Sequence, residues 1–229
     1  MKKALFILSI LFVTMSYGQE VKQIPQINVS GEGKIKVVPD EATIAVTVET
    51  KGNNAKDVKK QNDEKIDAVL KYIKKMNLAP ADYKTQRVSL NPQYDYEKKK
   101  HSYNATQTIE ILLRDLSKYD ELMGGLVDNG INRIDTVTFQ SSKMAQYESE
   151  ARKLAMKEAK MKAQDYVSVL GQKIGRALTI SDNSQTNYPQ PRYAAMKMME
   201  SSDMSAPRET LAVGEINITA NVTVSFILE

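Results

Sequence analysis

The sequence has 229 residues, of which 41% are hydrophobic and 26% are charged, and it contains one His and no Cys. This composition is typical of a globular protein and excludes collagen-like, mucin-like and wholly disordered chains. The lack of cysteine excludes disulfides, thiolate zinc sites, iron–sulfur clusters and a cysteine nucleophile, and one histidine is too few for an imidazole metal site.

Residues 1–18 have the pattern of a cleaved secretory signal. A short cationic start precedes the apolar run 4–15, which is shorter than the roughly 20 residues of a membrane-spanning helix. Ser16 and Gly18 then supply the small residues of a cleavage site, and no cysteine follows that could carry a lipid. We therefore expect an exported mature chain, residues 19–229, in the periplasm or associated with the outer membrane; an uncleaved anchor is the alternative.

The charge pattern argues against a nucleic-acid partner. The formal net charge of the whole sequence is +4, and the leader carries two of the lysines and no acid, so the mature chain is close to neutral. Basic and acidic residues alternate along the predicted helices and do not form a basic stripe. Without disulfides, stability must come from a packed core and from contacts between subunits.

The first half of the mature chain predicts two hairpins separated by a helix. Residues 27–38 and 41–50 alternate apolar with polar side chains around Pro39-Asp40, which predicts a hairpin. Between 54 and 77, one helical stripe is formed by Val58, Asn62, Ile66, Val69, Ile73 and Met76.

Residues 84–97 and 102–114 predict a second, longer hairpin with a polar and aromatic tip. The only histidine, His101, lies at this tip, where we expect a solvated side chain and no catalytic role. Tyr94, Tyr96 and Tyr103 are expected to pair across the strands; the alternative is contact with lipid headgroups or glycan.

The second half predicts two helices and three strands. A short helix capped by Asp115 or Ser117 runs to about Asp128, with an apolar face formed by Leu116, Tyr119, Leu122, Met123, Leu126 and Val127. A long helix follows at about 144–170 and ends at Gly171. One row of this helix contains Ala151, Ala155, Ala159, Ala163, Tyr166 and Leu170, and its small residues permit close packing. Strands are expected at 131–139, 174–181 and 210–228.

These elements give the order ββαββαβαββ, which predicts an α+β fold with a largely antiparallel sheet and three amphipathic helices. Gly31-Glu32-Gly33 precedes a strand and no helix N-terminus, so it does not fit a dinucleotide loop. A backbone role is favoured, in which glycine allows a bulge or a close approach. No serine and acid can be tied to His101 by spacing, and we expect no enzyme activity.

Several segments together resemble the SIMPL-domain family of bacterial periplasmic and outer-membrane-associated immunogenic proteins. They are residues 29–33 with 37–42, residues 102–108, residues 113–116 with 130–134, and residues 170–175. The similarity extends from about Ile27 to Leu228. It implies an α+β fold, an envelope location, a tendency to self-associate, a link to oxidative stress and no established catalytic residues.

The segment 182–207 lacks the periodicity of either helix or strand, and we interpret it as a flexible arm or an insertion in a hairpin. Four methionines in it are weak candidate ligands for Cu(I), which prefers soft thioether sulfur: Met196, Met198, Met199 and Met204. Methionines of this kind also consume oxidant by forming sulfoxides, and they pack readily in subunit contacts, which is the role we favour.

The leading hypothesis is a non-enzymatic envelope protein without a cofactor that forms a homo-oligomer through strand edges and the 182–207 arm, with peripheral association to the outer membrane. A module that captures a small ligand or Cu(I) through the methionine-rich arm is the alternative.

Overall fold

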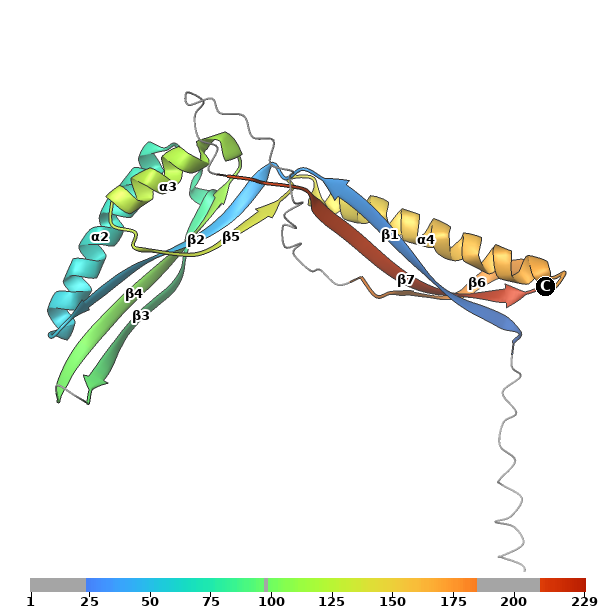
Figure 1. The fold of residues 1–229 in the computed structure, drawn as a ribbon, viewed down its shortest axis with the longest axis horizontal. Coiled ribbons are helices and arrows are strands. Elements are labelled where there is room, and N and C mark those ends of the chain that lie inside the picture. Colours follow the sequence, from blue (N-terminus) through green and yellow to red (C-terminus); the bar gives the residue numbers. More distant parts are fainter. Residues whose placement is uncertain (1–23, 97–98, 185–210) are drawn as a thin grey trace, which may run out of the picture.

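The computed structural model describes residues 24–96, 99–184 and 211–229, so the expected leader and most of the predicted arm lie outside the described residues. The described chain forms two antiparallel sheets, each covered on one face by helices. The two layers lie end to end in an elongated molecule with two lobes (Figure 1). The α+β fold class and the order ββαββαβαββ are confirmed.

The first lobe is built on a four-stranded sheet with the order β3-β4-β2-β5. Helices α2 and α3 cover one face and enclose an aliphatic core, whereas the opposite face is polar. Two short 3-10 helices, Pro80–Asp82 and Leu116–Lys118, precede β3 and α3. The elements are β2 (Glu41–Gly52), α2 (Ala55–Lys75), β3 (Tyr83–Asp95), β4 (Lys100–Leu113), α3 (Tyr119–Asp128) and β5 (Arg133–Gln140).

Helix α2 confirms the stripe expected from the sequence. It begins after Asn54, whose side chain accepts hydrogen bonds from the backbone N–H groups of Lys56 and Asp57. Its one buried polar residue, Asn62, donates to the Val48 carbonyl oxygen at 3.1 Å and so joins the helix to β2. The buried side chains are Val58, Asn62, Ile66, Val69 and Ile73.

The second lobe contains a three-stranded sheet with the order β1-β7-β6 and the long helix α4. Helix α4 ends before Gly171, which adopts the expected left-handed conformation with φ +69°. No helix in the described part of the chain is long and apolar enough to cross a membrane. The elements are β1 (Gln26–Val37), α4 (Met144–Val169), β6 (Ile174–Asp182) and β7 (Ile216–Leu228).

The glycines of β1 allow α4 to lie against the strand at backbone distance. A Cβ atom on Gly31 would stand 2.0 Å from the Ala155 carbonyl oxygen, and one on Gly33 would stand 1.9 Å from that of Ala151. The alanine row of α4 is fully buried from Ala151 to Ala163. The predicted close approach is therefore present, and the partner of the glycines is a helix.

Three local predictions are wrong. The segments 27–38 and 41–50 do not form a hairpin: β1 pairs with β7, and β2 pairs with β4 and β5 in the other sheet. Strand β7 begins at Ile216 and not at residue 210, because Gly214, with φ +58°, interrupts the extended backbone. Val127 is exposed and does not contribute to the face of α3.

The alanine row of α4 continues differently from the prediction. Its buried positions keep a four-residue step to Val167, so the row drifts around the helix. At about 100° per residue, Tyr166 lies about 100° and Leu170 about 60° around the helix from Val167, and both are exposed.

Candidate functional site

Helix α4 leaves one strand of its sheet uncovered. It packs on β1 and β7 and hardly touches β6. The reason is geometric, since a helix about 10 Å wide covers roughly two strands spaced about 4.8 Å apart. The flank of α4 that faces β6 therefore stands beside an uncovered strand.

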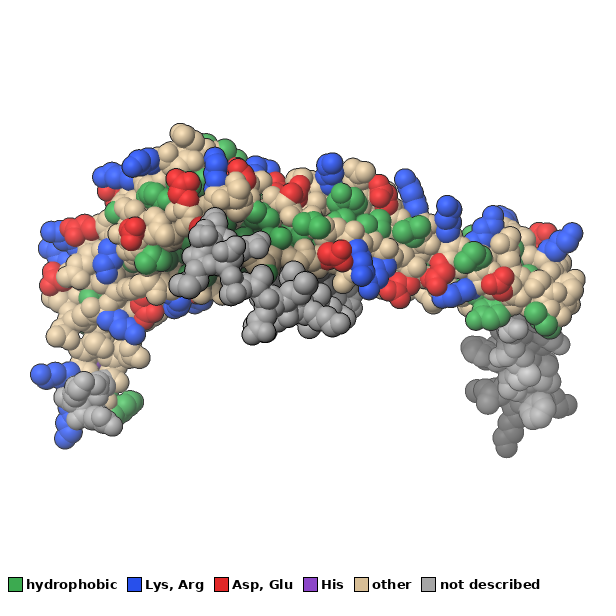
Figure 2. All heavy atoms as spheres, turned by 45° about the horizontal axis from the view of Figure 1, so that its top comes forward, with side chains coloured by type: hydrophobic (Ala, Val, Ile, Leu, Met, Phe, Trp, Pro, Cys, Tyr) green, Lys and Arg blue, Asp and Glu red, His purple; other side chains and the backbone are tan. Residues whose placement is uncertain are grey.

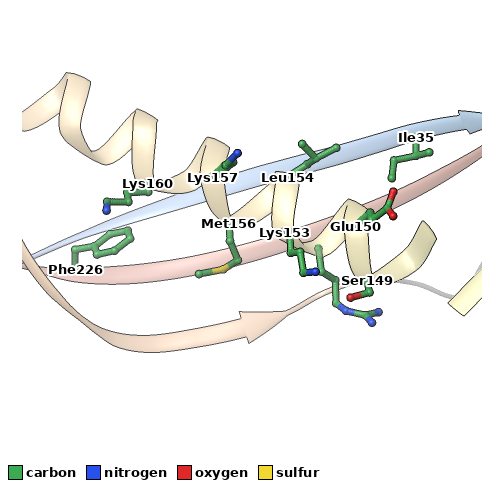
Figure 3. Close-up of a pocket in the computed structure, with 10 residues that line it drawn as sticks. Ile35, Ser149, Glu150, Lys153, Leu154, Met156, Lys157, Lys160 and Phe226 are labelled. Atoms are coloured by element: carbon green, nitrogen blue, oxygen red, sulfur yellow. The ribbon is translucent and has the colours of Figure 1, made fainter. Parts of the chain in front are cut away.

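The uncovered strand carries an apolar side chain on the α4 side of the sheet. Ile180 of β6 is paired with Val224 of β7, and partners across an antiparallel pair point to the same face. Because Val224 is buried under α4, Ile180 lies on the α4 side, where it remains 60% exposed. Phe226 and Met156 continue the apolar surface toward the helix (Figure 3).

A hollow of about 840 Å³ lies along the N-terminal half of α4. Figure 3 shows Met156, Lys160 and Phe226 on the β6 flank of the helix, and Leu154 beside Ile35 on the β1 flank. The lining residues are Ile35, Ser149, Glu150, Arg152, Lys153, Leu154, Met156, Lys157, Lys160 and Phe226. We call this hollow the α4 groove; its lining contains residues of β1, α4 and β7 and none of β6.

Three lysines lie on the solvent-facing side of the N-terminal half of α4. Lys153, Lys157 and Lys160 follow the i, i+4, i+7 spacing that places side chains on one side of a helix. Among the described residues, none of these three ammonium groups has a carboxylate within ion-pair distance. Figure 2 shows basic and acidic side chains interspersed along this lobe beside a band of hydrophobic side chains.

The side of α4 nearest the end of β6 is better balanced in charge. The Ser184 hydroxyl and backbone N–H donate to Asp182, and together with nearby Arg152 they lower the pKa of this carboxyl. Asp182 therefore stays ionised and opposes Arg152, so the unbalanced positive charge belongs to the three lysines.

The β1 flank of α4 has a structural role. The Glu158 carboxylate accepts the backbone N–H of Glu32, which lies on the outer edge of β1. Lys162 donates to the Ser30 carbonyl oxygen at 3.2 Å and pairs with Glu158 at 3.1 Å. These hydrogen bonds lower the pKa of Glu158.

A second hollow, of about 790 Å³, lies on the polar face of the four-stranded sheet. Its acids already have partners: Asp135 accepts from Arg133 at 2.7 Å, and Glu110 pairs with Lys84 at 2.8 Å. Thr108 shares a 2.6 Å hydrogen bond with Thr47. Because these side chains are already hydrogen-bonded or ion-paired to one another, none of the described residues that line this hollow is placed to act as a nucleophile or a base.

The residues singled out in the sequence do not form a site in the described chain. The candidate copper ligands Met196, Met198, Met199 and Met204 lie outside the described residues. His101 is exposed at the hairpin tip, with its ring 4.8 Å from that of Tyr94. Within the described ranges, no group of three or more His, Asp or Glu residues is placed to hold a metal ion.

Sequence reasoning missed the α4 groove. The lysines at i, i+4 and i+7 were visible, but acids elsewhere on the helix made them indistinguishable from a solvated face. The missing signal was strand pairing between distant segments, which brings β1 and β7 together under the helix.

Comparisons with known proteins place the whole fold in one family. The family model SIMPL, described as "Protein of unknown function (DUF541)", matches residues 27–226. "Uncharacterized protein YggE" of Escherichia coli strain K12 is 30% identical over 208 residues, covering 90% of this chain and 84% of that protein. The "26 kDa periplasmic immunogenic protein" of Brucella melitensis is 26% identical over 220 residues, covering 91% and 86%.

Proposed function

The chain belongs to the SIMPL family, and on that premise we propose that it is an exported, non-enzymatic cell-envelope protein that self-assembles and protects against oxidants. Two observations support the location. One relative is named a periplasmic protein, and residues 1–18 have the pattern of a secretory signal.

Self-assembly rests on one observation, the exposed apolar end of α4. Val169 is 85% exposed and Leu170 is 72% exposed, and Tyr166 is exposed one turn earlier. Large apolar side chains that gather at an exposed end are typical of protein–protein contacts. We therefore place the contact between copies at this end of the second lobe.

Free strand edges are less suitable contacts than the sequence suggested. The outer edge of β1 is occupied at Ser30 and Glu32 by side chains of α4. The other edge strands, β3, β5 and β6, all contain register shifts against their neighbours. Bulges of this kind disfavour regular pairing with another strand.

The test is sedimentation of the mature chain over a range of concentrations. We expect oligomers from the native sequence and monomers from a Val169→Ser, Leu170→Ser double variant. Val127→Ser is the matched control, because Val127 is an exposed valine on a helix of the other lobe. A native chain that stays monomeric, or a double variant that assembles as well as the control, would refute the contact.

Protection against oxidants would use methionine. A peroxide transfers one oxygen atom to the thioether sulfur, forms a sulfoxide and leaves as water or an alcohol. Met161 is exposed on α4, whereas Met123 is buried in the first core. Peptide mass spectrometry after peroxide treatment should find Met161 oxidised before Met123 with the circular dichroism unchanged; unfolding at the same dose would contradict a protective role.

A further inference from the structure

We propose that Tyr94 and Tyr96, at the tip of the β3–β4 hairpin, are a modification site for one-electron oxidants, where the two phenol rings couple to dityrosine within one chain. This inference goes beyond the proposed function, which assigns oxygen transfer from peroxides to methionine. It concerns a different chemistry, the removal of single electrons, and the hairpin tip lies at the opposite end of the molecule from the proposed contact between copies (Figure 1).

The composition of the sequence directs one-electron oxidation to tyrosine. Thiols and indoles compete with phenols for the loss of an electron, but the sequence contains no Cys and no Trp, whereas it contains 11 Tyr. The phenol ring is then the group in this chain that gives up one electron most readily near neutral pH. A radical formed elsewhere on the chain therefore tends to end on a tyrosine.

Only one pair of the described tyrosines is both exposed and in mutual contact. The exposed tyrosines among the described residues are Tyr96, Tyr166 and Tyr94, with exposed fractions of 84%, 60% and 40%. Within the same residues, Tyr94 and Tyr96 are the only two tyrosine rings that touch each other. An oxidised Tyr166 must find its partner on another copy, whereas Tyr94 and Tyr96 have a partner on the same chain.

The geometry of the pair favours coupling. The two ring centroids are 5.0 Å apart with their planes at 90°, an edge-to-face contact. The residues are two apart at the end of β3, and this spacing places both side chains on one face of an extended segment. The ring of His101, the partner of Tyr94 across the hairpin, lies 4.8 Å from the Tyr94 ring and restrains it. Because most of the Tyr96 side chain is in water, its ring can turn from the edge-to-face arrangement toward bonding.

The coupling removes two electrons and two protons from the pair. Each phenol loses one electron and its hydroxyl proton, and the two neutral radicals form one carbon–carbon bond between ring positions next to the oxygens. The hydrogen atoms on these two carbons then move to the oxygens, which restores both hydroxyl groups and both aromatic rings. When a haem peroxidase supplies the one-electron steps, one hydrogen peroxide molecule takes up the two electrons and two protons and becomes two water molecules.

The experiment treats the full mature chain with a haem peroxidase and a limiting amount of hydrogen peroxide, at several protein concentrations. Dityrosine fluorescence measures the total coupling. Trypsin cleaves after Arg87 and Lys98 and so releases both tyrosines in one peptide, residues 88–98. The cross-link within the chain lowers the mass of this peptide by two hydrogen atoms and suppresses fragment ions from backbone cleavage between the two tyrosines.

The test variant is Tyr96→Phe, and Tyr166→Phe is the matched control. Each change removes one hydroxyl group from an exposed ring, so folding should persist in both. We expect the cross-linked peptide from the native chain and from Tyr166→Phe, in a yield independent of protein concentration, and its complete loss from Tyr96→Phe. Peroxide without the peroxidase should oxidise Met161 and leave the tyrosines uncoupled, which separates this site from the methionine chemistry of the proposed function.

Three results would overturn the proposal. The first is a peptide 88–98 of unchanged mass from the native chain after peroxidase treatment. The second is a cross-link within this peptide that persists in Tyr96→Phe. The third is dityrosine that forms only between chains and increases with protein concentration, because the coupling would then belong to contacts between copies.

Discussion

Replacing Gly31 with alanine tests the closest contact in the second lobe. The added Cβ would stand 2.0 Å from the Ala155 carbonyl oxygen and 2.6 Å from the Ala159 amide nitrogen. Because both neighbours are backbone atoms, no change of side-chain rotamer can relieve the overlap. Helix α4 would have to move away from β1 by roughly 1.5 Å to restore ordinary contact distances of about 3.5 Å.

Such a shift separates the alanine row from the sheet along its length. Overpacking usually lowers the free energy of unfolding by about 1–3 kcal/mol, and a clash between backbone atoms belongs at or above the upper end of this range. We therefore expect Gly31→Ala to lower the free energy of unfolding by about 3 kcal/mol or more. Gly33→Ala should lose a similar amount, since its Cβ would stand 1.9 Å from the Ala151 carbonyl oxygen. The double variant should lose less than the sum, because one displacement of α4 relieves both clashes.

The assay is urea unfolding followed by far-ultraviolet circular dichroism. Gly124 of helix α3 provides the matched control, because a Cβ added there would meet no atom within 4 Å. Gly124→Ala should therefore raise stability by about 0.5–1 kcal/mol. Adding Ala159→Gly to Gly31→Ala should not rescue stability, because the nearest atoms remain. A loss below about 1 kcal/mol for Gly31→Ala would refute the reasoning.

Three further predictions concern the first lobe. Gly125→Ala should lower the free energy of unfolding, in contrast to Gly124→Ala, because its Cβ would meet the Tyr72 ring at 1.9 Å. In a Tyr72→Ala background, where that ring is absent, Gly125→Ala should lower the free energy of urea unfolding by less than it does in the native chain. Asn62→Ala should lower the free energy of unfolding by about 1–3 kcal/mol, since it removes the buried donor to Val48 and Thr50. Asn54→Gly, at the N-terminus of the same helix, should lower it by only about a few tenths of a kcal/mol. Hydrogen bonds and charge from Arg114 lower the pKa of the Asp82 carboxyl below its usual 3.8. The folded state therefore favours the ionised form, and Asp82→Asn should destabilise at neutral pH, with the difference from the native chain fading as the pH falls below about 4. A difference that persists unchanged at pH 3 would contradict this assignment.

Local periodicity was sufficient to predict individual elements. The stripe from Val58 to Ile73 combines steps of four and three residues, which only a helix brings to one face, and α2 follows it. The long hairpin of β3 and β4 was also predictable, because its two strands are neighbours in the sequence. Gly171 marked the end of α4 because the left-handed conformation favours glycine.

Pairing between distant segments was not predictable from one sequence. The alternation in β1 shows that one face is covered, but it does not reveal that the neighbouring strand is β7, about 190 residues away. The sequence therefore favoured the nearest partner, β2, and one sheet where the chain forms two. The uncovered position of β6 was missed for the same reason, since it depends on β7 lying between β1 and β6.

The junction between the lobes explains how a chain without disulfides keeps two small cores together. Within the described residues, the chain passes between the lobes after β1, after β5 and before β7, and the first two passages are tied to each other. The Asp40 N–H donates to the Gln140 carbonyl oxygen at 3.2 Å, and the Asp40 carboxylate accepts from the Ser142 N–H at 2.7 Å and from its hydroxyl at 2.6 Å.

The third passage is fixed by packing. Leu211 and Val213 contact the first core, and within five residues the chain enters β7, the central strand of the second sheet. Burial alone would raise the pKa of Asp40, but its hydrogen bonds with Ser142 outweigh this and lower it, so the carboxylate stays ionised at neutral pH. The placement of one lobe against the other therefore depends on a few junction residues, whereas the stability of each lobe depends on its own core.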